Sequence, residues 1–577
     1  MTRNEVYQLI KAMAAELQRS MSRLRAPRHP RPYYISYLVR DIESFNVWAR
    51  YGALYQDKRE HKRSCFADVR VGSYRYDQSS WVGLGDSEES EGIELGDLPI
   101  ENDMDSLRFC LWRLSDAKFR DAVSRYHGKR SRDVSYLDQF RGLPSFQKLE
   151  PSVVVRPLHA FAIDEEGWRS YVKKASLIFK KFPEIKNSYV EMTAEQCTKV
   201  FVDAEGNQRV WQEPIFSLTA YFWFHTKALD QDYSIVHHVS RLAELPSLDE
   251  LKREIRAKIE QFREVAEGDE VSSFAGPVLL SPKAAGLFLH EVVGHRMEGS
   301  RLLSESEGRT FKDKLGKKIM HPDLSMFDDP TLKSFSGRTL VGHYPFDDEG
   351  SPAQRAVLVE RGILKGFLTT RSPLQKTSHQ SNGHARNSAD ERPISRMANL
   401  LVLSHSTLTW EDLKQKLLLE IQRTGAPYGM ILLDVEGGET ETDAYNFQAF
   451  MGQIVVAVKV YPNGKERYVK GVDFVGTPLS SLSHIVAVGK DHHVDNGFCG
   501  AESGTVAVST VSPALLLSSL ELQAKSPSKV TPYAMPLPWF EAEDGAAVRG
   551  RRKPPKSAAM SGRGRLARKK GKKKAQR

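Results

Sequence analysis

One short stretch constrains this chain of 577 residues more than any other, because it places ionisable side chains inside an apolar run. The run from Ala284 to Val293 is nearly all apolar and therefore predicts a buried helix. It contains His290 and Glu291. After the run come Gly294 and then His295. A buried histidine or glutamate is costly unless it is paired or bound to a metal. The sequence therefore predicts a paired or metal-bound cluster on this helix.

The order His-Glu-x-x-x-His is one residue longer than the HExxH pattern, in which two histidines on one helix face hold zinc. On a regular α-helix, positions i and i+5 lie roughly 140° apart around the axis and about 7.5 Å along it. Two imidazoles so placed do not readily share one ion, so a metal site requires a π-bulge or a helix that opens near its end. Gly294 is where such a distortion costs least. The alternative is a packed helix with two hydrogen-bonded histidines and no metal.

A catalytic zinc usually takes three protein ligands, so a third would come from elsewhere in the chain. The candidates are Cys499, which lies among glycines on a loop expected after a strand, His384, and the cluster Asp491-His492-His493. A free cysteine is more often a small buried hydrophobic residue, and that alternative stays open. The chain has four cysteines without a CxxC pair, which indicates neither a disulfide framework nor a zinc ribbon and fits a reducing compartment.

Residues 1–270 alternate between helical and strand-like patterns, which predicts an N-terminal α+β domain. An amphipathic helix opens the chain, and a capping box at Ser247 and Glu250 begins another that runs to about 267. Further helices are expected at 103–127 and 165–182, and strands at 33–39, 45–55, 65–76, 189–202, 210–224 and 233–240. No catalytic motif is visible in this half, and His237 and His238 are predicted to be ordinary strand or surface residues.

Residues 271–545 are predicted to form a strand-rich C-terminal domain, an antiparallel curved sheet or barrel that carries the helix with the two histidines. A short strand near 277–280 leads to Ser281-Pro282, which indicates a helix start. Strands are expected at 339–344, 356–360, 364–370, 399–404, 430–436, 447–461, 471–475 and 485–488, with one helix at 410–424. The predicted fold class is therefore α+β.

The net charge of +10 comes from the C-terminus. Residues 546–577 contain fourteen Lys or Arg residues and no acidic residue, and removing these fourteen charges from +10 leaves −4 for the rest of the chain. This composition predicts a disordered basic tail, which can contact polyanions without sequence preference. A nucleic-acid-associated or regulatory protein is therefore the alternative function, although the rest of the chain is acidic and has no nucleic-acid-binding motif.

Targeting signals are not evident. No apolar stretch is long enough for a membrane span, and the N-terminus has no apolar signal-peptide segment. We therefore expect a cytoplasmic protein without a membrane partner.

Four motifs occur in the order and approximate spacing of the TldD/PmbA metallopeptidases, which the chain resembles over about 275–515. They are HEVVGHRMEG at 290–299, RPISRMAN at 392–399, VEGGETET at 435–442 and GFCG at 497–500. The resemblance is weaker over 1–270 and does not cover the basic tail. The chain departs from the family pattern after the cysteine, where Gly500-Ala-Glu-Ser-Gly504 stands in place of a glycine-rich run.

The resemblance implies a zinc metallopeptidase of the active, TldD-like type that acts on peptides or unfolded segments. It implies Zn2+ as the cofactor, held by His290, His295 and Cys499, with Glu291 as the general base. If Glu291 is not the base, Glu298 is the next candidate. Residues 271–545 would then be the catalytic metallopeptidase domain. The family also implies a homodimer, or a heterodimer with a related subunit.

Overall fold

The computed structural model describes residues 1–79, 96–135, 142–304, 307–308, 310–374, 380–388, 391–443, 448–525, 533 and 535–540. Met1–Pro532 form one compact unit and Tyr533–Arg577 a second. The predicted basic tail, 546–577, lies outside the described residues, and the domain boundary at 270 stays a prediction. No helix in the described part of the chain is long and apolar enough to cross a membrane.

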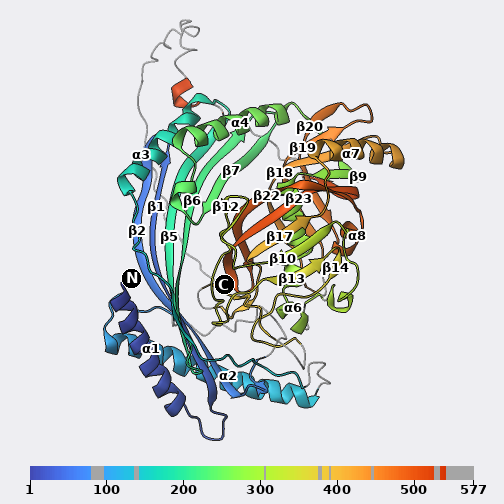
Figure 1. Ribbon diagram of the computed structural model, residues 1–577. Helices are drawn as coiled ribbons and strands as arrows, with labels where there is room; N and C mark the ends of the chain where they lie inside the picture. Colours follow the sequence, from blue (N-terminus) through green and yellow to red (C-terminus); the bar gives the residue numbers. More distant parts are fainter. Residues whose placement is uncertain are drawn as a thin grey trace, which may run out of the picture. The chain divides into compact units, whose positions relative to one another are not determined.

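The first half of the chain builds a seven-stranded sheet in the order β3-β2-β1-β5-β6-β4, with β7 also paired to β6 (Figure 1). Its strands are β1 (Pro32–Arg50), β2 (Ala53–Ser73), β3 (Tyr76–Asp77), β4 (Val153–Val155), β5 (Ile185–Asp203), β6 (Gln208–His225) and β7 (Asp230–Val239). Its helices are α1 (Arg3–Arg23), α2 (Met104–Ser135), α3 (Glu165–Ser176) and α4 (Leu248–Ala266), with 3₁₀ turns at Leu177–Lys181 and Leu242–Glu244. Apolar residues of α1 and α2 share one core with β1 and β2, and those of α3 and α4 share another with β1, β5 and β6.

One predicted strand of this sheet, 45–55, is wrong at its end, because the chain reverses direction inside it. Arg50 pairs with Ala53 across a two-residue turn, and Tyr51 and Gly52 have φ angles of 49° and 92°. A tight hairpin of this kind needs positive φ at both central residues, which glycine adopts without strain. The β-rich pattern on both sides of Gly52 hid this turn.

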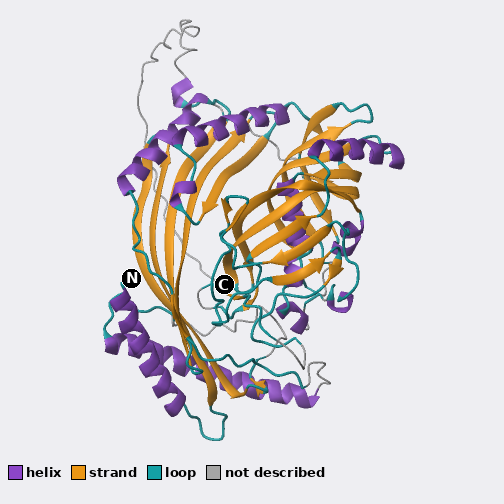
Figure 2. Cartoon of the chain, in the orientation of Figure 1, coloured by secondary structure: helices purple, strands orange, loops and turns teal. Residues whose placement is uncertain are grey.

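The second half builds a twelve-stranded sheet in which ten strands follow the order β14-β13-β10-β17-β23-β9-β18-β19-β20-β8. Outside this path, β21 pairs with β19 and β23, and β22 pairs with β23. Figure 2 shows the strand-rich character of this half. Its longer strands are β9 (Ser273–Leu280), β10 (Leu324–Asp328), β13 (Ala356–Glu360), β17 (Asn399–Ser404), β18 (Gly429–Thr440), β19 (Phe450–Val460), β20 (Glu466–Lys470), β21 (Val472–Gly476), β22 (Ile485–Ala501) and β23 (Gly504–Ala524). Its short strands are β8 (Asp269–Glu270) and β14 (Ile363–Leu364). Two separate two-stranded sheets are formed by β11 (Ser334–Phe335) with β12 (Arg338–Thr339) and by β15 (Ala385–Arg386) with β16 (Ile394–Ser395).

Part of this sheet closes on itself. Strands β23, β9, β18, β19 and β21 pair in succession, and β21 also pairs with β23, so the five strands form a barrel. Each of these pairs is antiparallel except β9 with β18. The α+β fold class with a strand-rich domain and a barrel is therefore confirmed.

Four helices accompany this sheet: α5 (Pro282–Val292), α6 (Ser300–Leu303), α7 (Trp410–Thr424) and α8 (Pro478–Ser483). The 3₁₀ turns lie at Gly294–Met297, Lys312–Lys314 and, in the second unit, Pro538–Phe540. Helix α5 packs against β18 and β23 in the largest hydrophobic core, so the predicted helix with the two histidines is carried by the barrel.

Several local predictions for the second half are confirmed and others are wrong. Helix α7 and strands β13 and β17 have the predicted bounds. The predicted strands at 339–344 and 364–370 are mostly irregular, because their amides bond outside any ladder: Leu368 N donates to Met297 O at 2.8 Å, and Val341 N to Ser509 Oγ at 2.8 Å. Strand β22 continues from the predicted 485–488 to Ala501, and neither β10 nor β23 was expected.

Candidate metal centre

Helix α5 begins and ends as its sequence favours. The Ser281 side chain accepts a hydrogen bond from Ala284 N at 3.2 Å, and Pro282 occupies the first turn. The helix ends at Val292, and Gly294–Met297 continue as a 3₁₀ turn. His290 therefore lies on the last α-helical turn and His295 on the 3₁₀ turn. Of the two predicted distortions, the structure has the helix that opens near its end and not the π-bulge.

The opening brings the two histidine rings together, with centroids 5.0 Å apart and planes at 86°. Gly294 serves this geometry by its small size, since a Cβ atom there would lie 2.2 Å from Sδ of Met397. The absence of a side chain at Gly294 thus allows the turn to pack closely against the buried Met397.

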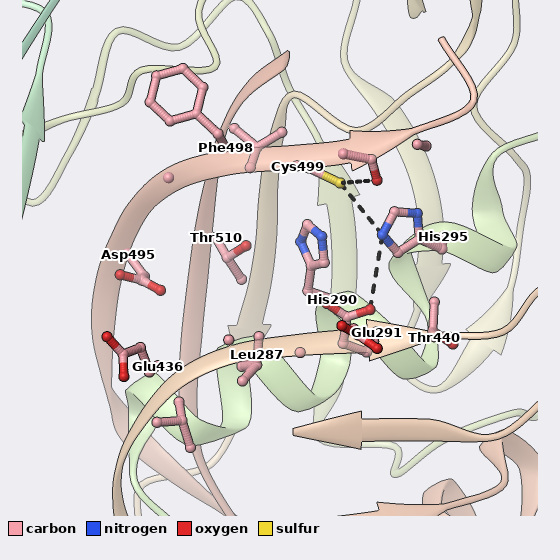
Figure 3. Close-up of a pocket in the computed structure, with 18 of the residues that line it drawn as sticks. Leu287, His290, Glu291, His295, Glu436, Thr440, Asp495, Phe498, Cys499 and Thr510 are labelled. Atoms are coloured by element: carbon pink, nitrogen blue, oxygen red, sulfur yellow. Dashed lines mark hydrogen bonds and ion pairs between the residues drawn. The ribbon is translucent and has the colours of Figure 1, made fainter. Parts of the chain in front are cut away.

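Cys499 lies in strand β22 and not on a loop, so that part of the prediction is wrong. Its Sγ is 3.4 Å from Nε2 of His295. The donor atoms of His290, His295 and Cys499 all lie within 4.8 Å of one another, and all three residues are buried (Figure 3). Among the described residues, these three form the one group of histidine, cysteine or carboxylate donors that is close enough to share an ion.

The other candidate ligands point elsewhere. His384 is fully buried, with Nε2 3.2 Å from Oδ1 of Asp328. His492 accepts a hydrogen bond from Ser404 N at 3.1 Å. Neither these two histidines nor Asp491 and His493 join the group of donors around the two motif histidines.

The three clustered groups shift one another's ionisation. Burial by itself raises the pKa of the Cys499 thiol, but His295 and His290 beside it hold that pKa well below its usual value. In turn, burial lowers the pKa of both histidines, and the Cys499 sulfur outweighs this effect, so both pKa values are raised. This lowered thiol pKa favours the thiolate, which is the form that binds metals.

Glu291 lies beside this group and is itself buried. Its Oε2 is 3.9 Å from Nε2 of His295, the same ring nitrogen that faces Cys499. Strand β18 passes directly over it at Gly438, as Figure 3 shows for the strand and the glutamate. The carboxylate therefore lies next to the ring nitrogen of His295 that faces Cys499.

Glu298 contacts the other edge of the His295 ring, with Oε2 3.3 Å from Nδ1. It is fully buried. Burial raises its pKa, but His295 and Arg301 outweigh this effect and lower the pKa to about 2. The sequence pattern indicated Glu298 only as an alternative base, whereas the structure places its carboxylate on the far side of the imidazole from Cys499.

The cluster lines a cavity of about 750 Å³. Strands β7, β18 and β22 and helix α5 all contribute to its walls. At the end away from His295 lie Asp495 and Glu436, whose carboxyl pKa values are raised by burial (Figure 3).

His238 of β7 also lines this cavity, although its sequence context predicted an ordinary strand residue. Its Nδ1 lies 2.7 Å from Ser217 Oγ, and its ring meets Phe498 edge-on at 5.0 Å between centroids. Burial and the neighbouring His237 lower the pKa of His238 to about 4. No motif marks this residue, because the fold alone brings β7 to the cavity.

Comparison with known proteins identifies the second half of the chain. Residues 274–524 match the family model described as the PmbA/TldA metallopeptidase C-terminal domain. This part of the chain is therefore similar to the C-terminal domain of the PmbA/TldD metallopeptidases. A metalloprotease of Archaeoglobus fulgidus is 34% identical over 243 residues, which are 41% of this chain and 51% of that protein. A zinc metalloprotease TldD homolog of Saccharolobus solfataricus is 26% identical over 247 residues, which are 43% and 51% of the two chains. The chain thus spans about half the length of these curated PmbA/TldD relatives.

Solved structures extend the likeness in fold to the first half. TldE from Thermococcus kodakarensis is 12% identical, with a TM-score of 0.58 over 89% of this chain and 100% of that chain. A putative modulator of a DNA gyrase from Thermotoga maritima is 16% identical, with a TM-score of 0.57 over 85% of this chain and 96% of that chain. At these identities the likeness shows a shared fold and nothing about activity.

Proposed function

We propose that this PmbA/TldD family member is a zinc-dependent metallopeptidase that hydrolyses peptides or unfolded segments. The observation that carries the proposal is the buried group of His290, His295 and Cys499 in the wall of a cavity that also contains Glu291. The relatives named as a metalloprotease and a zinc metalloprotease support the same activity.

The residues present fit zinc. Two imidazoles and a thiolate match the nitrogen and sulfur ligands that zinc takes, and three protein donors leave a fourth position open. The lowered pKa of Cys499 supplies the thiolate that such a ligand requires. When bound, zinc supplies a Lewis acid that polarises the scissile carbonyl and acidifies a water molecule.

The protein side chains carry the proton transfers. Glu291 accepts a proton from the attacking water and delivers it to the leaving amine, acting first as a general base and then as a general acid. Its position 3.9 Å from the ring nitrogen of His295 that faces Cys499 supports this role, because a water bound beside these donors would lie near the carboxylate. Gly438 keeps it there, because β18 leaves the Glu291 side chain little space to turn away.

The burial of the site limits what can reach it. The three donors are buried and line the cavity, so an extended segment that enters the cavity can approach them more readily than a folded protein surface. This geometry favours peptides and unfolded segments as substrates.

We infer two further properties of the protein. The resemblance of its sequence motifs to the family implies a dimer, either of this chain or with a related subunit, which light scattering would measure. All four cysteines are free, which supports a reducing compartment such as the cytoplasm.

Metal removal tests the proposed activity. The purified protein should contain zinc and hydrolyse an unfolded polypeptide, lose both after treatment with a chelator, and regain both when zinc is restored. Hydrolysis that continues in demonstrably metal-free protein would contradict the proposal.

A further inference from the structure

Arg396 belongs to the 392–399 motif, and the proposed ligand set does not explain it. It is fully buried at the end of the β22–β23 hairpin. Its guanidinium donates to Cys499 O at 2.7 Å, to Gly504 O at 2.7 Å and to Ser503 Oγ at 3.0 Å. One side chain therefore holds both strands where they turn, directly at the proposed cysteine ligand.

The same guanidinium reaches the histidine side of the site through Glu298. Its Nε lies 3.4 Å from Glu298 Oε1, while Glu298 Oε2 faces Nδ1 of His295 at 3.3 Å. The buried Glu298 thus contacts His295, which is one proposed ligand. It also contacts Arg396, which holds the backbone of the other, Cys499.

Arg301 forms a second connection of the same kind. Its Nε donates to Glu298 Oε2 at 2.9 Å. Its two terminal nitrogens donate to the carboxylate of Glu502, on the β22–β23 turn, at 2.8 and 2.9 Å. Glu298 is therefore linked to the turn beside Cys499 by two arginines.

Stability alone is a weak reason for such an arrangement, because removing charges from water costs about as much as their pairing returns. Its geometry matches what a metal site requires. A histidine that donates its second ring N–H to a carboxylate is fixed in tautomer and orientation, and its free nitrogen becomes a better donor. Here that contact leaves Nε2 of His295 facing Cys499.

We propose that Glu298, Arg301 and Arg396 are positioning residues that hold His295 and Cys499 in place before the metal arrives and so set the metal affinity of the site. The inference rests on the proposed zinc site and goes beyond it. None of the three side chains is proposed to bind the metal or the substrate.

The test compares Glu298→Gln and Arg396→Lys with the wild type. Zinc affinity is measured by competition with a chromophoric chelator, and the visible spectrum of the cobalt(II)-substituted protein reports the geometry at the metal. We expect roughly 10- to 100-fold weaker zinc binding in both variants, together with an altered cobalt spectrum. Lysine keeps the charge of Arg396 but cannot make its several directed contacts at once.

Asp348→Asn is the matched control. Asp348 is also buried and paired with two cations, Lys199 at 2.9 Å and Arg40 at 3.5 Å, but it contacts no proposed ligand. Its variant should bind zinc within threefold of the wild type. Equal weakening in Asp348→Asn and Glu298→Gln would overturn the proposal, because any loss of a buried carboxylate would then have the same effect.

A double variant covers the case in which Glu298→Gln does not fold, since that change leaves Arg396 with a buried, less compensated charge. Glu298→Gln/Arg396→Met removes both charges and should recover thermal stability while zinc binding stays at least tenfold weaker. Wild-type affinity in a folded Glu298→Gln or double variant would overturn the positioning role. A wild-type protein that binds no zinc would instead contradict the proposed function.

Discussion

A Cβ atom on Gly438 would lie 2.8 Å from Cγ of Glu291, so strand β18 approaches this glutamate as closely as a glycine allows. Gly438→Ala should therefore push the carboxylate away and lower kcat/KM on an unfolded peptide by on the order of 100-fold. Zinc content should stay at the wild-type value, because none of the three donors is displaced. Gly437→Ala is the control, since nothing lies within 4 Å of a Cβ atom there. Equal losses in both variants would assign the effect to the strand rather than to Glu291.

The metal donors are tested one at a time. His290→Ala, His295→Ala and Cys499→Ala should each reduce bound zinc from about one per chain to near zero at neutral pH, because each removes one of three ligands. Elemental analysis of the dialysed proteins measures the loss. Cys110→Ala removes a thiol from α2, away from the cavity, and should retain its zinc. Stoichiometric zinc in all three donor variants would rule out this ligand set.

A variant of Glu291 distinguishes zinc binding from catalysis. Glu291→Gln keeps the size of the side chain but cannot accept the proton of water, so hydrolysis should fall by roughly 10²- to 10⁴-fold. Zinc content and turnover need to be measured on the same preparation, beside Glu360→Gln on the exposed face of β13 as a control. An active, zinc-loaded Glu291→Gln protein would show that another group takes the proton.

The lowered pKa of His238 predicts a pH dependence of stability. The pKa is about 4 in the folded protein, whereas a histidine in the unfolded chain titrates near pH 6.5. Between these values the unfolded state binds a proton that the folded state does not, so this contribution to stability is complete above pH 6.5 and is lost as the pH falls towards 4.

His238→Gln should therefore show a smaller drop in urea midpoint than the wild type between about pH 7 and about pH 4.5. His29→Gln, which changes an exposed histidine, should behave like the wild type. Identical drops in the His238 variant and the wild type would show that His238 does not cause the effect.

The basic tail is tested by deleting residues 546–577. These residues include few large apolar side chains. Their removal should therefore leave the fold, the zinc content and the hydrolysis of short neutral peptides unchanged. Retention on DNA should fall and lose its steep salt dependence, because the rest of the chain carries a net charge of −4 once the fourteen tail cations are subtracted from +10. Unchanged retention would point to a nucleic-acid surface elsewhere and favour the alternative function.

Local signals in the sequence predicted local structure well. The capping box of Ser247 and Glu250 is present, with Glu250 N donating to Ser247 Oγ at 3.4 Å and Ser247 N to Glu250 Oε2 at 2.9 Å. The helix start at Ser281-Pro282 and the break before His295 also follow from nearby residues. In each case the determining contacts lie within a few positions of one another.

Long-range pairing was not predictable in the same way. The polar stretch 489–497 is typical of a loop, yet it forms part of β22 because β23 pairs with it. Pro513 argues against a central strand, but it sits opposite His492 next to a register shift that accommodates it. This hairpin brings Cys499 to His295 across 204 positions, which is why chemistry alone left three candidate ligands open.

The cavity wall formed by β7 has a consequence for how proteins of this kind diversify. Tyr233, Ile235 and Val236 line the cavity, but they lie outside residues 274–524, which carry the family match and the proposed metal donors. Part of the cavity wall is thus encoded in a different stretch of the gene from the proposed metal donors. Under the proposed function, substitutions in the ten residues of β7 would change the shape of the substrate cavity and leave the proposed metal donors unaltered.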